Sequence, residues 1–277
     1  MKSKCVVLLS GGLDSRLAVK IMQKRGFDVV AVFFKLPFGT GCCDENCSFN
    51  FSQLQGIELK VFDCTKGKLF QEYLDIVRNP KYRRGTAMNP CIDCRIFILK
   101  KAKEFADKEK IKYIATGEVE GERPMSQMKK SLDIIEEESG LKGRLVRPLC
   151  EIGIQGRRRD KQIELAKKFG ISYPNPGGGC LLCEKLYCEK LKKIINKKIE
   201  FDDVRLLNIG RHFENSEIIL GRNNSENKML EREKGIKIIP KQPGATALIK
   251  SRKYEEKAKE LIRRYSKKEI REFEVRE

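Results

Sequence analysis

The residues best suited to chemistry lie near the start of the chain, in the run Ser10-Gly11-Gly12-Leu13-Asp14-Ser15. An apolar run over 5–9 precedes it and a helix-like stretch over 17–24 follows it. Adjacent glycines let the backbone approach an anion closely, and the N–H groups of a helix's first turn point at that anion. The two serines add hydroxyl donors, and Asp14 is placed to hold Mg²⁺ against phosphate oxygens. The run therefore predicts a pyrophosphate pocket, although it lacks the Gly-Lys-Ser/Thr ending of the common nucleoside-triphosphate loop.

Cysteines form the second group of candidate residues. The sequence contains 11 of them, and four make two CxxC pairs. Cys91 and Cys94 open a helix-like stretch, where the partial positive charge of a helix N-terminus favours thiolates. Cys180 and Cys183 follow three glycines, which allow the chain to fold tightly around whatever the sulfurs hold. The spacing is compatible with a four-cysteine zinc site, an iron–sulfur cluster on three of the four cysteines, or a redox thiol pair. For Cys183, an ordinary place in a helix is the alternative.

Alternating strand-like and helix-like stretches must position these residues. We predict strands at 5–9, 28–34, 57–62, 111–116 and 144–146, and helices at 17–24, 68–77, 95–108, 125–138 and 161–169. This rhythm predicts an α/β fold with a doubly wound, mostly parallel sheet. Such sheets bind ligands at the carboxyl ends of their strands, where the pyrophosphate pocket falls.

A third group of cysteines, Cys42, Cys43 and Cys47, falls in a turn-rich loop after the second predicted strand. We expect this loop to lie near the edge of the sheet that carries the pyrophosphate pocket. There it would bind a second metal, relay sulfur or have no chemical role.

Changes in composition divide the chain into three parts. The sequence predicts a first domain over 1–175, a cysteine-bearing linker with a helix over 176–199, and a small α+β domain over 200–277. We expect the helix at 183–198. In the last domain we expect short strands at 217–220, 236–239 and 246–249, followed by a charged helix at 254–273.

The charge balance is strongly basic. The chain carries 58 Lys and Arg against 39 Asp and Glu, a formal net charge of +19, which favours a polyanionic partner. Basic residues outnumber acidic ones by 24 to 15 over 190–277, so the excess is denser there. No segment approaches the roughly 18 apolar residues of a membrane span, and no signal peptide is recognised. We therefore expect a cytoplasmic protein without membrane contact, whose cysteines bind metal or carry thiol chemistry. A homodimer is left open.

Together these motifs resemble the tRNA thiouridylases of the PP-loop ATP pyrophosphatases, whose fold is adenine nucleotide alpha-hydrolase-like. Ser10 to Ser15 matches their pyrophosphate loop. Residues 89–95 (Asn-Pro-Cys-Ile-Asp-Cys-Arg) are similar to the segment that carries their first sulfur-handling cysteine, and residues 114–117 (Ile-Ala-Thr-Gly) resemble their strand-end ATP motif. Cys180 occupies their late cysteine position. The resemblance implies an ATP site built from Ser10, Gly11, Gly12, Asp14, Ser15, Phe33, Thr116 and Gly117.

The resemblance also implies a reaction. ATP would adenylate a uracil carbonyl oxygen, diphosphate would leave with Mg²⁺, and sulfur would replace the oxygen. Catalytic roles fall on Asp14, Cys94 and Cys180, and a [4Fe–4S] cluster falls on Cys91, Cys94 and Cys180. Cys183 would then be surplus, whereas with zinc it would be the fourth ligand. The implied partners are tRNA and a sulfur donor, either sulfide or a persulfide carrier.

Candidates for RNA contact occur in both domains. Residues 219–223 (Ile-Leu-Gly-Arg-Asn) and 243–247 (Pro-Gly-Ala-Thr-Ala) resemble the RNA-binding domain of NFACT-type proteins, and in this C-terminal domain Arg211 and Arg222 are the candidate residues. In the first domain, Arg157, Arg158 and Arg159 form a compact run in a glycine-flanked loop. The single histidine, His212, fits an RNA contact or a surface position better than catalysis.

Two other functions are compatible with the sequence. One is an ATP-dependent amide- or nitrile-forming enzyme that acts on a small molecule and carries a structural four-cysteine zinc site. The other is a non-catalytic RNA-binding protein with a retained nucleotide fold, which the intact Ser10–Ser15 run disfavours.

Overall fold

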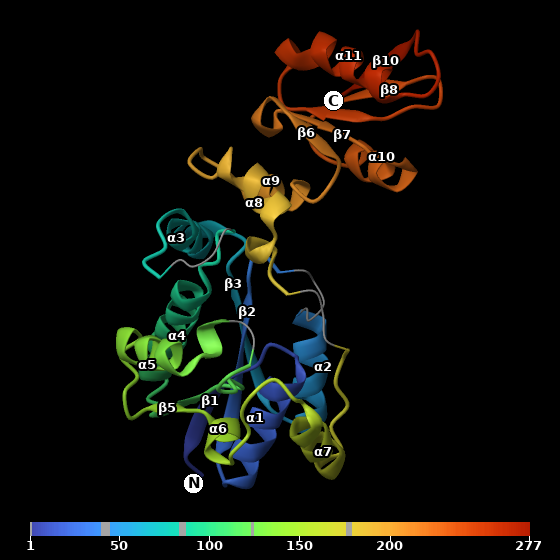
Figure 1. Ribbon diagram of the computed structural model, residues 1–277. Coiled ribbons are helices and arrows are strands. Elements are labelled where there is room, and N and C mark those ends of the chain that lie inside the picture. Colours follow the sequence, from blue (N-terminus) through green and yellow to red (C-terminus); the bar gives the residue numbers. More distant parts are fainter. Residues whose placement is uncertain (1, 40–44, 83–86, 123–124, 176–178) are drawn as a thin grey trace. The chain divides into compact units, whose positions relative to one another are not determined.

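The computed structural model describes residues 2–39, 45–82, 87–122, 125–175 and 179–277 (Figure 1). It divides into two compact units, Met1–Cys183 and Glu184–Glu277. No helix in these described ranges is both long and apolar enough to cross a membrane.

The first unit is built on a five-stranded parallel sheet. Its strands are β1 (Lys4–Leu8), β2 (Asp28–Lys35), β3 (Glu58–Asp63), β4 (Tyr113–Ala115) and β5 (Leu145–Val146), in the order β3-β2-β1-β4-β5. The order reverses between β1 and β4, which pair in parallel with Val6 level with Ile114. A reversal of this kind opens a crevice at the carboxyl ends of the two strands. The predicted doubly wound α/β fold is therefore confirmed.

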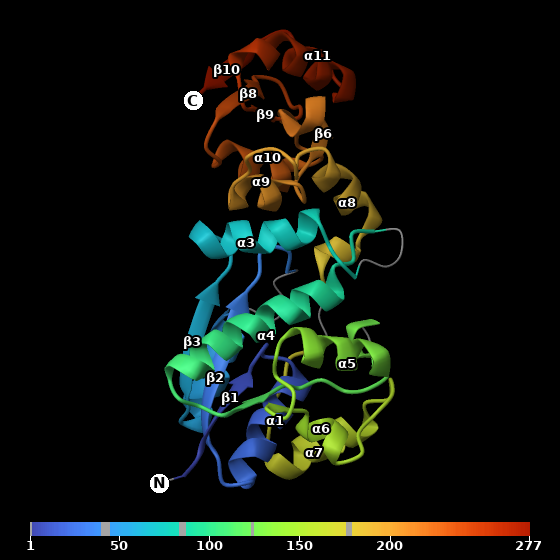
Figure 2. The same cartoon turned by 90° about the vertical axis from the view of Figure 1, so that its left-hand side faces the viewer.

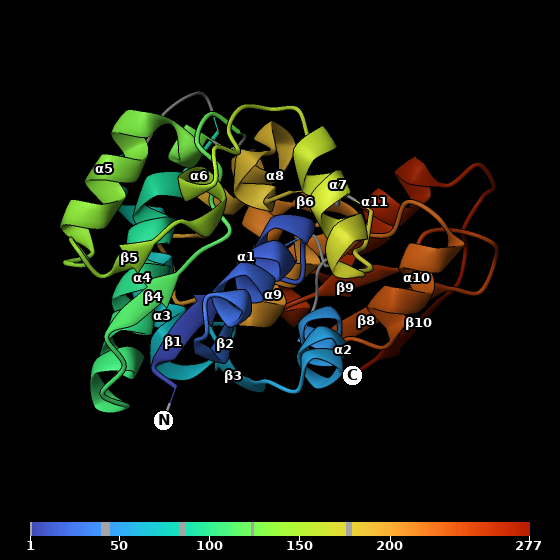
Figure 3. The same ribbon diagram turned by 90° about the horizontal axis from the view of Figure 1, so that it is seen from below.

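Helices cover both faces of this sheet. One face carries α1 (Leu13–Lys24), α2 (Glu45–Gln55), α6 (Pro148–Glu151) and α7 (Asp160–Phe169), and the other carries α3 (Gly67–Arg78), α4 (Cys91–Lys108) and α5 (Lys129–Glu138) (Figures 1, 2 and 3). The α1 side holds an apolar core, where Val7 of β1 and Leu17 of α1 are completely buried. Burial of this apolar surface fixes the helices against the sheet and thereby the loops at the strand ends.

The second unit is a small α+β fold around an antiparallel sheet. Its strands are β6 (Arg211–Phe213), β7 (Ile218–Leu220), β8 (Ile236–Pro240), β9 (Ala247–Ile249) and β10 (Phe273–Arg276), in the order β10-β8-β9-β7-β6. Its helices are α8 (Lys185–Lys192), α9 (Phe201–Leu206), α10 (Asn224–Glu231) and α11 (Glu255–Tyr265). The unit has apolar clusters of its own, one of which joins β7, β8 and β9 to α11. The prediction of a small α+β domain is confirmed.

Several predicted helix boundaries are wrong. The helix expected at 183–198 ends at Lys192, and a separate helix, α9, begins after a capping box between Glu200 and Asp203. The helix expected at 254–273 ends at Tyr265 because Ser266 is extended, and the alternating residues that follow form β10 against β8. The helix expected at 125–138 begins only at Lys129, after a 3₁₀ turn.

Some helices were missed altogether. The turn expected at residues 221–224 contains Asn223, whose side chain accepts the Glu226 N–H and thereby starts α10. Another missed helix is α2, which occupies the end of the loop expected after β2.

Candidate active site

The predicted pyrophosphate loop joins β1 to α1 at the crevice between β1 and β4. Gly11 has a positive φ of 85° and Gly12 caps the helix. Ser15 Oγ donates to the Gly12 carbonyl at 2.9 Å, and Ser10 Oγ donates to Ser15 Oγ at 3.3 Å. The first N–H groups of α1 have no partner within the helix, so this loop presents donors and a positive dipole end toward the crevice.

Asp14 lies in the first turn of α1 and is largely buried. Its Oδ1 has no hydrogen-bond partner among the described residues. Burial raises the pKa of this carboxyl, and the positive charge of Arg159 partly opposes that rise. A buried carboxylate oxygen without a donor is costly unless a ligand satisfies it. Asp14 therefore fits a hard cation such as Mg²⁺, which prefers carboxylate oxygens.

The end of β4 closes the crevice from the other side. A Cβ at Gly117 would lie 2.5 Å from Ser15 N and 2.6 Å from Asp14 C, so only glycine fits against the loop. Thr116 is fully buried, and its hydroxyl lies 3.1 Å from Glu118 Oε2. A cavity of about 280 Å³ opens here, lined by residues that include Ser10, Gly12, Asp14, Ser15, Phe33 and Gly117. The loop, the strand end and Phe33 thus share one pocket.

The four CxxC cysteines come together beside this pocket. Cys91 and Cys94 occupy the first turn of α4. The late pair is brought to them by three backbone contacts: a bridge between Gly39 and Cys180, a Leu181 N–H bond to Phe38 O at 3.0 Å, and an Asn89 N–H bond to Leu182 O at 3.1 Å. A cavity of about 320 Å³ is lined by Tyr73, Cys91, Cys94 and Cys180 among others.

The cysteine sulfurs alter one another's pKa. The neighbouring thiols of Cys180 and Cys91 lower the pKa of Cys183, and Cys183 raises the pKa of both partners. The buried Tyr73 hydroxyl donates to Cys94 Sγ at 3.1 Å. Burial raises the pKa of Cys94, and this hydrogen bond opposes the rise.

Thiolates are the ligands that zinc and iron–sulfur clusters require, so the chemistry of this donor set fits such a group. In the described part of the chain, however, no three His, Cys, Asp or Glu side chains are arranged to hold a metal ion.

The nucleotide cavity and the cysteine cavity share part of their walls. Leu36, Arg95, Ile98 and Gln127 line both. Arg95 Nε lies 3.1 Å from Glu118 Oε1, and Arg147 Nε lies 3.0 Å from Glu118 Oε2. Glu118 is completely buried, so the two guanidinium groups supply the charge pairing that a buried carboxylate needs. Sequence reasoning missed Glu118, although its position directly after the Thr116-Gly117 strand end was an available signal.

Of the remaining candidate cysteines, only Cys47 is among the described residues. Cys42 and Cys43 fall outside the described residues. Cys47 lies in α2, and its Cβ is 3.3 Å from where a Cβ of Gly11 would be. Its carbonyl accepts from Arg16 Nη2 at 3.4 Å. The predicted loop therefore contains a helix that packs on the phosphate loop.

The arginines proposed for RNA contact have different surroundings. Arg157 and Arg158 are exposed, whereas Arg159 is half-buried near Asp14. In the second unit, Arg211 lies over the ring of Tyr265 at 4.9 Å, and Arg222 Nε donates to Glu226 Oε1 at 2.8 Å. The Arg222 guanidinium is therefore already held by a carboxylate.

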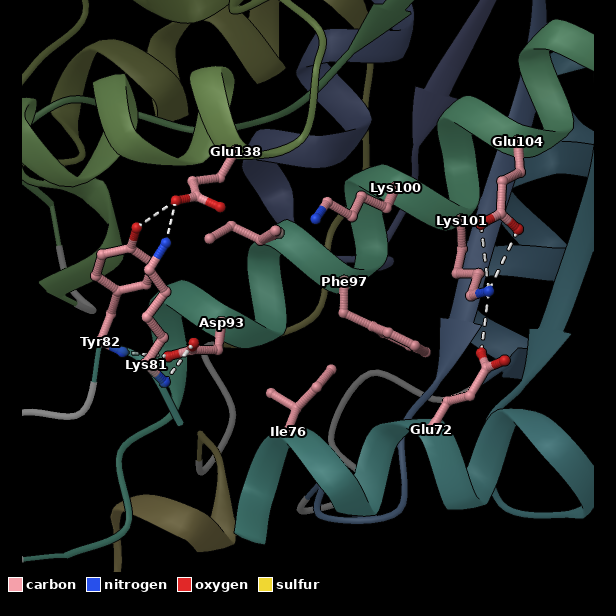
Figure 4. Close-up of a pocket in the computed structure, with 11 residues that line it drawn as sticks. Glu72, Ile76, Lys81, Tyr82, Asp93, Phe97, Lys100, Lys101, Glu104 and Glu138 are labelled. Carbon is pink, nitrogen blue, oxygen red and sulfur yellow. Dashed lines mark hydrogen bonds and ion pairs between the residues drawn. The ribbon is translucent and has the colours of Figure 1, made fainter. Parts of the chain in front are cut away.

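A further cavity, of about 400 Å³, lies between α3, α4 and α5 (Figure 4). Its charged groups pair with one another: Tyr82 donates to Glu138 at 2.6 Å, and Lys101 lies 3.0 Å from Glu72. Asp93 accepts the backbone N–H groups of Lys81 and Tyr82, which anchors residues 81–82 to α4. On α4 this cavity is lined by residues such as Asp93 and Lys100, whereas the cysteine cavity is lined by Cys91, Cys94 and Arg95.

Several curated proteins similar to this chain are tRNA-specific 2-thiouridylases. A 26% identical relative over 242 residues is a tRNA-specific 2-thiouridylase of a Thermoanaerobacter species, with 76% of this chain and 65% of that protein covered. A tRNA-specific 2-thiouridylase of a Nitratiruptor species is 32% identical over 127 residues, which cover 42% and 35% of the two chains. This chain thus spans less than two thirds of the length of these relatives.

Solved structures give a more distant likeness. A 4-thiouridine synthetase in complex with RNA and ATP is 21% identical, with a TM-score of 0.46 over 74% of this chain and 52% of that one.

Among protein families, the thiamine biosynthesis protein (ThiI) family matches residues 1–185, which include the phosphate loop and all four CxxC cysteines. The predicted relationship to the PP-loop thiouridylases is confirmed, and the chain belongs to the ThiI family.

Proposed function

We propose that this chain is an ATP-dependent tRNA uridine sulfurtransferase. The observation that carries the proposal is the shared wall between the nucleotide cavity and the cysteine cavity, at Arg95 and Gln127. An adenylated intermediate formed in one cavity lies next to the sulfur groups of the other. Proximity of this kind lets sulfur attack before water hydrolyses the intermediate.

The reaction has two steps with defined bond changes. The uracil carbonyl oxygen attacks the α-phosphorus of ATP, and the bond to the β-phosphate breaks. Diphosphate leaves into the Ser10–Ser15 loop, where the N–H donors of α1 and a Mg²⁺ ion on Asp14 balance its charge. A sulfur nucleophile then attacks the activated carbon, and AMP departs with the former carbonyl oxygen. Sulfide or a persulfide carrier is the proposed sulfur donor.

We assign Cys91, Cys94 and Cys180 as ligands of a [4Fe–4S] cluster, whose open iron would hold and deprotonate sulfide. The closeness of Cys183 to Cys91 and Cys180 supports the alternative of a four-cysteine zinc site. The metal content separates the two. Protein purified without oxygen should contain about four irons and matching acid-labile sulfide per chain if the cluster forms, and one zinc otherwise.

The function itself is tested by nucleoside mass spectrometry of tRNA incubated with the protein, ATP, Mg²⁺ and sulfide. We expect a thiolated uridine, together with AMP and diphosphate whose release requires tRNA. Asp14→Asn should lower the rate at least about a hundredfold because the metal ligand is lost.

Asp28→Asn, at an exposed aspartate that begins β2, is the matched control and should retain activity. Release of AMP and diphosphate without tRNA would favour a small-molecule substrate. Absence of both products under all conditions would contradict the proposal.

A further inference from the structure

Arg159 belongs to a loop that is anchored onto the phosphate site. Gly117 packs directly on Asp14 and Ser15. The chain that follows Gly117 is joined to the 155–159 loop by a bridge between Glu120 and Gln155, and the Gly156 N–H donates to Glu120 O at 2.7 Å. Three loops from distant parts of the sequence are therefore stacked in order: the phosphate loop, residues 117–122 and residues 155–159.

Helix α7 fixes the direction of this loop. Arg159 is the residue that caps α7, and α7 packs against α1 (Figures 1 and 3). Ala166, two turns into α7, is buried in the same apolar core as Leu17 of α1. Gln162 lies one turn after Arg159 and one turn before Ala166, so it shares their face of the helix.

These elements contain several buried polar atoms without hydrogen-bond partners. Within the described residues, no hydrogen-bond partner exists for Asp14 Oδ1, Arg159 Nε, or the side-chain nitrogen and oxygen of Gln162. Gln162 has no exposed surface at all. Unpaired buried polar groups are rare because each costs free energy. Several together, at a site that is built for an anion, indicate that a ligand supplies the missing partners.

The electrostatics agree with this placement. Arg159 lies close enough to Asp14 and Glu122 for its charge to oppose the rise in the pKa of both carboxyls. Burial and the charge of Asp14 raise the pKa of Glu122 to about 7. Arg157 and Arg158 have no such neighbours and are exposed.

The geometry points to a further diphosphate-binding residue: the Arg159 guanidinium binds the β- and γ-phosphates of ATP, and Gln162 behind it completes the hydrogen bonds. This inference rests on the proposed use of ATP, and it removes Arg159 from the RNA-binding residues expected from the sequence. A guanidinium suits the role because its fixed fork of donors matches phosphate oxygens. Its charge is also opposite in sign to that of the departing diphosphate.

Binding of inorganic diphosphate with Mg²⁺, measured by calorimetry on the full chain without RNA, tests the inference. Arg159→Met should weaken diphosphate binding about 10- to 100-fold, because a charged hydrogen bond is lost. Arg159→Lys keeps the positive charge but loses the forked donors of the guanidinium. Its affinity for diphosphate should therefore lie between that of Arg159→Met and that of the wild type. AMP has no β- or γ-phosphate, so its affinity should change less than about twofold in either variant.

Arg158→Met is the matched control, because it makes the same chemical change at the exposed neighbour, and it should leave diphosphate affinity unchanged. Unaltered diphosphate affinity in both Arg159 variants would overturn the inference. A loss of tRNA affinity in Arg159→Met, with diphosphate affinity kept, would overturn it in favour of RNA contact. If Arg159→Met does not fold, Arg159→Lys alone decides.

The outcomes separate this inference from the proposed function. Wild-type protein that binds diphosphate and thiolates tRNA, with no effect of Arg159, contradicts only the role of Arg159. Wild-type protein that binds no diphosphate at all contradicts both.

Discussion

At the scale of single residues, the polar side chains of Tyr73 and His212 have different hydrogen-bond partners. Tyr73 is almost fully buried, and its hydroxyl donates to Cys94 Sγ at 3.1 Å. That contact distinguishes Cys94 from the three cysteines around it. His212 Nε2 instead lies at hydrogen-bond distance from the Ile209 carbonyl oxygen, 2.9 Å away, and Nδ1 has no hydrogen-bond partner among the described residues.

His212 predicts a pH-dependent stability of the second unit. Burial lowers the pKa of His212 to about 4 from its usual 6.5. The unfolded chain therefore binds the extra proton between these values, so stability is complete above pH 6.5 and falls as the pH drops toward 4. The loss should reach about 2–3 kcal/mol.

Urea unfolding of the wild type and of His212→Gln, at pH values from 4 to 7.5, measures this loss. The glutamine keeps an amide donor for Ile209 O but does not titrate. Carboxylates contribute equally to both proteins, so the difference between the two curves isolates the histidine. Parallel curves would rule out the buried, neutral state.

At the scale of elements, one helix serves two cavities. The face of α4 that carries Cys91, Cys94 and Arg95 lines the cysteine cavity. Another side of the helix, with Asp93 and Lys100, lines the separate cavity of Figure 4. Because the helix is a rigid element, a ligand or substitution on one face is expected to affect the other only if α4 itself moves.

The contact between β4 and α1 gives a prediction at this scale. Gly117→Ala would place a Cβ 2.5 Å from Ser15 N, against backbone that cannot rotate away. The first turn of α1 must then shift, and the affinity for diphosphate with Mg²⁺ should fall more than about tenfold.

Gly39→Ala is the comparison, because its Cβ would meet only Leu36 O, at an ordinary 3.8 Å. Calorimetric titration of both variants with diphosphate measures the effect. Equal affinities in the two variants would show that the close approach of Gly117 is not needed for the site.

At the scale of the whole molecule, the main feature is the excess of positive charge. A net charge of +19 on 277 residues favours association with a polyanion. Each unit has its own core, so the phosphate chemistry of the first unit and the dense basic charge of the second are carried by separately packed structures.

The affinity for tRNA should therefore depend steeply on salt. If about six phosphates are neutralised, the binding constant should fall about a thousandfold between roughly 50 and 200 mM salt, because released counterions no longer favour binding. Filter binding of labelled tRNA to the full chain measures the slope. A change of less than about threefold over this range would exclude phosphate contacts as the main source of affinity.

The sequence by itself determined the parallel sheet, the phosphate loop and the family, because these depend on local patterns. An apolar run, two glycines and a capped helix are readable within about 20 residues. The ends of α8 at Lys192 and of α11 at Tyr265 were predicted wrongly, because charged residues suit an exposed helix and an exposed edge strand alike. For residues 273–276, pairing with β8 decided the outcome.

Only the tertiary structure decided how distant residues combine. Cys183 joins the other three cysteines through contacts made by Phe38 and Asn89, which no local pattern encodes. Arg159 looked identical to Arg157 and Arg158 in the sequence. Stacking of the 155–159 loop on residues 117–122 buries part of one guanidinium beside Asp14 and leaves the other two in solvent. Burial and charge proximity arise only when the chain packs, so the roles of these residues could not be read from their types alone.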